Sequence, residues 1–382
     1  CARMHDSRNI PPLIGKRVTM LREELGLTQE QLAARLGIAS RQSVQAMESG
    51  KRKIQVEELL ALMDLSGRPL SYFTDPFTWE GEGNFSFRLE PEGRARLGEY
   101  EKVAGDCAML WQYLMEFAGI RVTSKPGIGI SVESSYEDVA NIANTLVSWL
   151  GLGAVPSLTL ADIIEEEFLI PVLHVDAPKG ISGATFHNAG VNIIFINRNE
   201  VAGRRNFNVA HEFFHALTWA VAAPPREDTE GARSRTAARW EQLANVFASN
   251  ILMPDKAVRS LWADIESRYP TTEKNDIPEM VREAAGHFQV TRPAMYWRLV
   301  DMRLVDPDAK HEILSGLGAN PQTDGALSPH CTPLSKLLLR HLADTIGRGG
   351  ISVRKACSIL RYEIDSLADA YRNHGLAIPF EL

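Results

Sequence analysis

The sequence N-F-N-V-A-H-E-F-F-H at residues 206–215 contains the pattern H-E-x-x-H. On a helix, positions i and i+4 lie on one face about one turn apart, so the rings of His211 and His215 can both reach one metal ion. Glu212 would lie beside that ion, where it can take a proton from a bound water. Asn206 is the expected cap of this helix, and the apolar neighbours of the motif predict that the helix is buried.

A catalytic zinc site needs a third protein ligand and one open position for water. The extended motif would place a third histidine six residues after His215, but Val221 stands there. Glu241 is the best candidate, because it lies in an otherwise apolar helical stretch and follows His215 by enough residues for a returning antiparallel helix. An inward carboxylate is costly unless it is paired or metal-bound. The alternative is a surface glutamate at the edge of that helix.

The flanking sequence predicts an α+β fold that is mainly helical. Apolar runs rich in branched residues predict strands of a small sheet at 168–175, 182–186 and 191–196. Helical periodicity predicts helices elsewhere, at 95–117, 136–150, 158–167, 206–219, 234–252, 255–268, 278–302, 334–346 and 351–373.

The motif helix and the segment E-Q-L-A-N-V-F-A-S-N-I-L-M-P at 241–254 together resemble the ImmA/IrrE family of zinc metallopeptidases, over roughly residues 130–305. Asn197 and Ala210 also match the family pattern, while Phe213-Phe214 stand where a Leu-Gly pair is common. The resemblance implies a gluzincin-like centre in which His211, His215 and Glu241 hold Zn²⁺ and Glu212 is the general base.

The resemblance also implies a substrate class. Members of the family usually cut one or a few regulatory proteins, often repressors, after DNA damage or phage stress. Peptide hydrolysis needs a further donor for the oxyanion. The sequence offers five candidates and does not choose among them: His174, His187, Arg204, Arg205 and Tyr269.

Residues 13–65 show short amphipathic helices joined by glycine-containing turns, which is typical of a helix-turn-helix. Thr28 with Gln31 predicts a capping box, and Ser40 predicts the cap of the next helix. The segment resembles the phage-repressor-like (XRE) helix-turn-helix, in which the second helix of the motif enters the major groove. The residues expected to contact DNA are Gln29, Arg41, Gln42, Ser43, Gln45, Lys51 and Arg52. Such heads often read two half-sites as dimers, so a homodimer is one option, and the sequence leaves the oligomeric state open.

The distribution of charged residues also separates the N-terminal head from the rest of the chain. Residues 1–53 carry ten Lys/Arg and five Asp/Glu, whereas the remainder carries 31 and 43. A basic head on an acidic body indicates that only the head approaches nucleic acid. The alternative is a helical head that binds protein. The expected organisation is a helix-turn-helix domain at 1–74, a linker and helix at 75–130, the peptidase domain at 131–305, a linker at 306–333 and a helical segment at 334–382. The Pro-, Gly- and acid-rich residues 75–95 are expected to form a linker or a strap on the surface.

The composition is that of a globular protein, with 45% hydrophobic and 23% charged residues. No apolar run of membrane-spanning length is found, so a membrane protein is not expected. The four cysteines form no C-x-x-C pair, which excludes a disulfide framework and favours the cytoplasm. Cys107 invites one hypothesis, that its thiolate fills the fourth zinc position and inhibits the enzyme. The alternative is a small buried hydrophobe.

The sequence therefore predicts a cytoplasmic zinc endopeptidase that cuts a repressor-like protein and binds DNA, acting in stress, DNA-damage or phage-defence responses. One alternative is a DNA-binding transcriptional regulator whose peptidase-like domain senses a ligand or metal without proteolysis. Another is an antitoxin-like DNA-binding partner.

Overall fold

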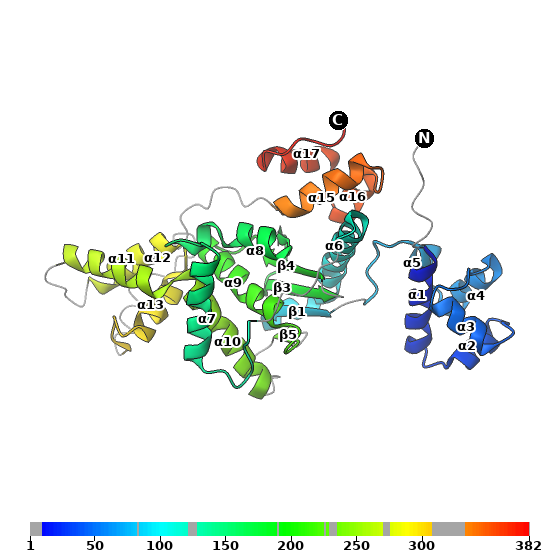
Figure 1. Cartoon of the computed structure of the whole chain (residues 1–382), viewed down its shortest axis with the longest axis horizontal. Coiled ribbons are helices and arrows are strands. Elements are labelled where there is room, and N and C mark those ends of the chain that lie inside the picture. The colour runs from blue at the N-terminus through cyan, green and yellow to red at the C-terminus, as the bar shows by residue number, and fades with distance from the viewer. Residues whose placement is uncertain are drawn as a thin grey trace.

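A computed structural model describes residues 10–81, 84–120, 128–188, 191–224, 227–228, 235–269, 276–307 and 333–381. Within these residues no helix is both long enough and apolar enough to cross a membrane. The chain forms an N-terminal helical lobe, a central sheet with helices on both faces, and a C-terminal helical segment (Figure 1).

The N-terminal lobe contains five helices, α1 (Ile10–Glu24), α2 (Gln29–Arg35), α3 (Arg41–Glu48), α4 (Val56–Ser66) and α5 (Leu70–Thr74). The capping box predicted for α2 is confirmed, because Thr28 Oγ1 accepts from the Gln31 amide and Gln31 Oε1 accepts from the Thr28 amide. The Ser40 cap of α3 is confirmed as well. A Cβ at Gly15 would lie 2.5 Å from the carbonyl oxygens of Met47 and Glu48, so glycine there lets α1 pack directly on the end of α3.

The central sheet has the strand order β2-β4-β3-β1-β5. Its strands are β1 (Asn84–Leu89), β2 (Val172–Val175), β3 (Ile181–Asn188), β4 (Val191–Asn197) and β5 (Glu227–Asp228). β3 pairs antiparallel with β4 on one side and with β1 on the other, while β2 runs parallel to β4 and β5 runs parallel to β1.

One face of the sheet carries the motif helix. Ile194 and Ile196 of β4 pack in one core with Ala210 and Phe213 of that helix. The helices of this core are α7 (Tyr136–Trp149), α8 (Leu160–Phe168), α9 (Ala202–Thr218), α10 (Arg235–Leu252), α11 (Asp255–Arg268), α12 (Ile277–Phe288) and α13 (Arg292–Asp301), with a 3₁₀ turn at Pro156–Leu158. The motif is thus fixed between the sheet and α10.

The opposite face packs against a separate core. Phe85, Phe87 and Phe186 contribute from the strands. The helices are α6 (Leu97–Ala118), which follows a 3₁₀ turn at Pro91–Arg96, and the C-terminal α15 (Lys336–Gly347), α16 (Val353–Leu360) and α17 (Ile364–Asn373). Buried Glu165 of α8 ties this segment to the sheet, since it accepts from the amides of Val172 on β2 and Leu337 on α15. A cavity of about 860 Å³ lies on this face between α6, the ends of β2 and β4, and the C-terminal helices.

The strands expected at 182–186 and 191–196 are confirmed, but three local expectations were wrong. The expected linker over 75–95 contains β1, which is a full member of the sheet. The apolar run 168–175 is not one strand, because α8 continues to Phe168 and Leu169 adopts a left-handed φ of 54° before β2 begins. Asn206 is not a cap, since α9 begins at Ala202 and the Asn206 side chain donates to the Gln289 carbonyl. Most of the expected linker at 306–333 lies outside the described residues.

Candidate metal centre

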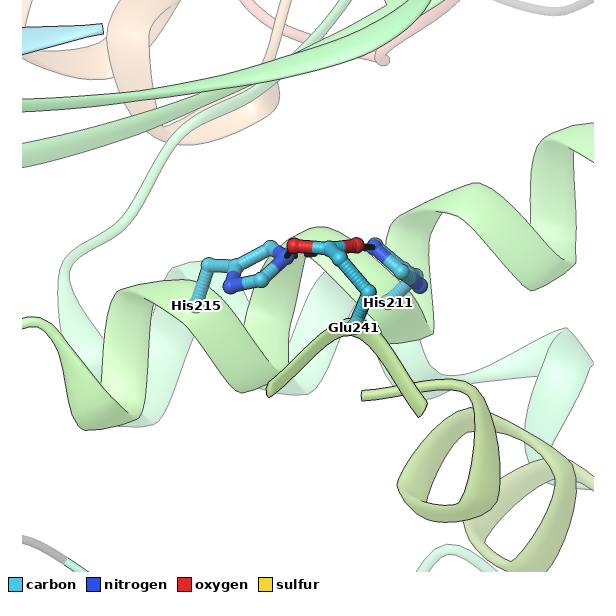
Figure 2. A group of neighbouring side chains, drawn as sticks. All are labelled: His211, His215 and Glu241. Carbon is cyan, nitrogen blue, oxygen red and sulfur yellow. Dashed lines mark hydrogen bonds and ion pairs between the residues drawn. The ribbon is translucent and has the colours of Figure 1, made fainter. Parts of the chain in front are cut away.

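Three predicted ligands converge where α9 and α10 cross (Figure 2). The Nε2 atoms of His211 and His215 lie 3.1 Å apart. Glu241 spans the pair, with Oε2 at 3.0 Å from His211 Nε2 and Oε1 at 3.2 Å from His215 Nε2. In the described part of the chain no other three His, Cys, Asp or Glu side chains come together in this way.

These separations fit a zinc ion. Ligand atoms at about 2.0–2.2 Å from one tetrahedral ion lie roughly 3.3 Å from each other. The donor set of two imidazoles and one carboxylate is also the set that catalytic zinc uses. Asn245 Oδ1 lies 3.1 Å from His211 Nδ1, so it can accept the ring proton there and leave the Nε2 lone pair for the metal. The residues present therefore fit the ion that the sequence predicted.

Burial sets the charge of the ligands. His211, His215 and Glu241 are each 2% exposed. Burial lowers the pKa of His211 to about 4, so this ring is neutral at pH 7, which is the form that binds a metal. Burial disfavours the ionised form of Glu241, but the adjacent His215 and His211 outweigh it and hold the pKa of this carboxyl below its usual range. A neutral imidazole and an ionised carboxylate face the same point.

Glu212 lies next to this group and points toward the sheet. Thr185 Oγ1 on β3 donates to Glu212 Oε2 over 2.6 Å. The other carboxylate oxygen packs against Gly183, where a Cβ would lie 3.1 Å from it. Burial raises the pKa of Glu212 to about 7, although His215, the Thr185 hydrogen bond and Arg88 oppose the shift. A carboxylate with this pKa can take up and release a proton near neutral pH.

Three of the five oxyanion candidates from the sequence are engaged in other contacts. His187 stacks on Trp219 and bonds to Asn192. Arg204 pairs with Glu90 and Glu200, and Arg205 donates to the carbonyls of Arg198 and Glu200. His174 lies on β2, which β4 separates from β3, and Tyr269 lies at the end of α11.

Cys107 is not brought to the metal-ligand group. It lies on α6, in the core on the other face of the sheet, and it lines the cavity there. Burial raises the pKa of its thiol to about 12, which disfavours the thiolate that a metal needs. These surroundings agree with the alternative expectation, that Cys107 is a small buried hydrophobic residue.

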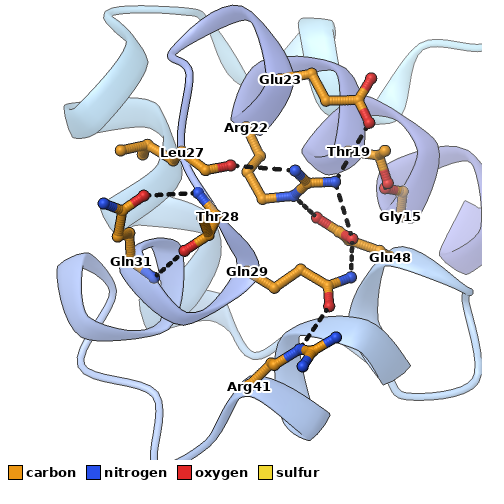
Figure 3. Close-up of polar contacts among 10 residues, drawn as sticks. All are labelled: Gly15, Thr19, Arg22, Glu23, Leu27, Thr28, Gln29, Gln31, Arg41 and Glu48. Carbon is orange, nitrogen blue, oxygen red and sulfur yellow. Dashed lines mark hydrogen bonds and ion pairs between the residues drawn. The ribbon is translucent and has the colours of Figure 1, made fainter.

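In the N-terminal lobe, α3 presents Arg41, Gln42 and Gln45 to solvent, while Ser43 is half-buried. Val44 and Met47 are buried in the lobe's core, as predicted. Two other predicted DNA-contacting residues have internal partners. Gln29 donates to Glu48 and accepts from Arg41 (Figure 3), and Arg52 pairs with Glu58 and donates to the Ser43 carbonyl. Lys51 is exposed.

Sequence reasoning missed Thr185, Asn245 and Arg88. Arg88 of β1 donates to Asn208 of α9, one turn before the motif. The sequence did contain a pattern that predicts β1, because Phe85, Phe87 and Leu89 alternate with polar residues as in a half-buried strand.

Comparison with family models supports both units. Residues 166–299 match the IrrE N-terminal-like domain, and residues 19–73 match a helix-turn-helix. The two matches confirm the modules expected from the sequence and coincide with the metal-ligand group and the N-terminal lobe. No curated protein matches the chain.

Proposed function

We propose that this chain, an ImmA/IrrE-type metallopeptidase-like protein with a DNA-binding helix-turn-helix, is a zinc-dependent endopeptidase that cleaves a specific repressor-like regulatory protein. The observation that carries the proposal is the convergence of His211, His215 and Glu241 within 4.8 Å, with Glu212 on the same helix beside them. A zinc ion held by the three ligands would act as a Lewis acid on the water and on the peptide carbonyl.

The chain's own residues then move the proton. Glu212 accepts it from the attacking water as the carbon–oxygen bond forms, and gives it to the leaving amine as the carbon–nitrogen bond breaks. Thr185 donates to one carboxylate oxygen and Gly183 leaves room for the other, so the carboxylate is held in a fixed orientation beside the metal-ligand group. The apolar surroundings on α9 and α10 exclude bulk water and strengthen these electrostatic contacts.

The first test compares the purified full-length chain with Glu212→Gln. We expect both proteins to bind one equivalent of zinc, measured by elemental analysis. Each is incubated with candidate repressors, with and without duplex DNA, and only the chain with Glu212 is expected to produce a defined cleavage product by mass spectrometry. Cleavage by Glu212→Gln at the wild-type rate would refute the mechanism.

A second candidate function has one observation in its favour. The three ligands and Glu212 are each only 1–2% exposed, so the described conformation is closed around the group. A closed metal site suits a transcriptional regulator whose peptidase-like domain senses a metal or ligand without proteolysis. Zinc-dependent DNA affinity without cleavage of any repressor would favour this function over the peptidase.

The helix-turn-helix would couple the site to transcription in a stress, DNA-damage or phage-defence response. We expect it to act as a homodimer on two half-sites. Light scattering of the free and DNA-bound chain tests the oligomeric state.

A further inference from the structure

β1 brings a segment from outside the matched peptidase domain to the metal side of the sheet. It pairs with β3 along its whole length, with Ser86 opposite Thr185 and Arg88 opposite Gly183. Phe85 and Phe87 point into the core on the far face. Because successive side chains of a strand alternate between faces, Ser86 and Arg88 lie on the face that carries α9.

The β3 partners of these two residues are the ones that seat the general base. Thr185 donates to Glu212 Oε2, and Gly183 makes room for Glu212 Oε1. Residues directly opposite on one face of an antiparallel pair have Cβ atoms about 4.5–5.5 Å apart. Arg88 is therefore the cross-strand neighbour of Gly183, the residue against which the Glu212 carboxylate packs.

Contacts with α9 fix the direction of the Arg88 side chain. Arg88 Nη1 donates to Asn208 Oδ1 over 3.0 Å. The side-chain nitrogen of Asn208, Nδ2, in turn donates to Glu200 Oε2 over 2.6 Å. The guanidinium carbon lies 5.7 Å from the ring centre of Phe207. Asn208 precedes Glu212 by four residues, so it lies on the same face of α9 one turn earlier.

The burial and charge of Arg88 suit a role at the metal-ligand group. Arg88 is half-buried, whereas the ligands and Glu212 are buried. Its positive charge acts on both His211 and Glu212. The five oxyanion candidates suggested by the sequence do not include it.

We propose that Arg88 is a catalytic residue of the metal site, whose guanidinium binds the carbonyl oxygen of the scissile peptide and stabilises the negative charge that forms there. The inference rests on the proposed peptidase function. As water oxygen bonds to the carbonyl carbon, the carbonyl π electrons move to oxygen and Glu212 takes the water proton. Arg88 remains protonated throughout, and the electron pair returns when the carbon–nitrogen bond breaks.

The test uses the full-length, zinc-loaded chain and the repressor identified as substrate. We expect Arg88→Gln to lower kcat by about 100-fold or more with a much smaller change in KM, and to keep its zinc. Arg88→Lys is expected to lose at least about tenfold, because lysine cannot reproduce the paired donors. Arg96→Gln, which removes an exposed arginine from the neighbouring turn, is the matched control and should leave kcat unchanged.

Two readouts separate catalysis from a structural role. Added guanidinium should restore part of the kcat of Arg88→Ala. A phosphinic peptide built on the cleaved sequence, with oxygens that mimic the charged intermediate, should bind Arg88→Gln about 100-fold more weakly, whereas the uncleaved parent peptide should bind equally to both.

The outcomes that contradict the proposal are distinct. No cleavage by the wild-type chain would overturn the peptidase function and this inference together. Wild-type cleavage with undiminished kcat in folded Arg88→Gln would overturn the role of Arg88 alone. If Arg88→Gln does not fold, undiminished kcat and phosphinic-peptide affinity in Arg88→Lys would overturn it.

Discussion

Thr185 on β3 donates a 2.6 Å hydrogen bond to Oε2 of Glu212 on α9, and its hydroxyl lies 3.1 Å from the Glu212 carbonyl oxygen. One side chain therefore fixes both the backbone and the carboxylate of the proposed general base. Because both residues are buried, water cannot replace this contact easily. The sheet therefore holds the carboxylate of the proposed base in one orientation beside the metal-ligand group.

Replacing Thr185 by valine should keep the fold and the zinc but reduce cleavage. Valine has nearly the same shape and leaves Glu212 Oε2 without its donor, at a cost of about 1–3 kcal/mol. We expect kcat to fall by about tenfold or more. Thr218→Val is the matched control, because Thr218 is almost equally buried on α9 and its hydroxyl donates to the Phe214 carbonyl instead of to Glu212. Equal kcat in the two variants would show that Thr185 does not orient the base.

Gly183→Ala tests the space left for Glu212. The new Cβ would lie 3.1 Å from Glu212 Oε1 and 3.3 Å from the Phe195 carbonyl oxygen, so the carboxylate must shift. We expect reduced kcat with unchanged zinc content. Gly98→Ala on α6, where a Cβ meets no atom within 4 Å, should leave kcat unchanged and stabilise the fold by up to about 1 kcal/mol. Thermal unfolding and steady-state kinetics measure both effects. Full activity of Gly183→Ala would show that the added Cβ does not displace the Glu212 carboxylate.

Asn245→Ala should weaken zinc binding. Asn245 Oδ1 accepts from His211 Nδ1 and so favours the tautomer that offers Nε2 to the metal. Loss of such a partner typically costs about 10–100-fold in metal affinity. Competition with a chromogenic chelator measures the change. Gln242→Ala, on the same helix and bonded to Tyr136, is the control. Unchanged zinc affinity in Asn245→Ala would show that His211 needs no partner.

Local patterns of the sequence predicted the metal-ligand triad and the helix-turn-helix, because each depends on spacing within a helix or between two consecutive helices. His211, Glu212 and His215 share one helix, and Glu241 lies on the next. The support from the sheet could not be predicted in the same way. The contacts of Thr185 and Arg88 with α9 join residues that are 27 and 120 positions apart in the sequence, and they depend on the register of the strands. β1 was also masked by the Pro- and Gly-rich composition around it, although its alternation of Phe85 and Phe87 with polar residues was visible.

Cys107 should behave as an inert core thiol. Burial raises its pKa from 9.0 to about 12, so at pH 8 the folded chain holds about 1,000-fold less thiolate than an ordinary cysteine would. Alkylation of Cys107 by iodoacetamide should be slower by about this factor than in urea, and should accelerate about tenfold per pH unit while the fold persists. Peptide mass spectrometry measures the rates. Cys107→Ser should keep its zinc, and release of inhibited peptidase activity by this variant would revive the fourth-ligand hypothesis.

Gln42 and Arg52 should affect DNA binding in different ways, although the sequence predicted both as DNA contacts. Gln42 is exposed at the start of α3, where a glutamine can bind one adenine through two hydrogen bonds, worth about 1–3 kcal/mol. Gln42→Ala should therefore lower affinity for a duplex selected from a random pool, without changing stability or affinity for unrelated duplexes. Arg52 instead joins α3 to α4 through the Ser43 carbonyl and Glu58.

Arg52→Ala should therefore destabilise the N-terminal lobe by about 1 kcal/mol and weaken binding to all duplexes. Fluorescence anisotropy at several salt concentrations, combined with thermal unfolding, separates the two effects, since loss of a phosphate contact lowers the salt slope by about one. If Arg52→Ala lowers that slope while the lobe keeps its full stability, Arg52 contacts phosphate directly and its pairing with Glu58 is dispensable. If Gln42→Ala weakens binding to every duplex equally, α3 does not read bases at this position.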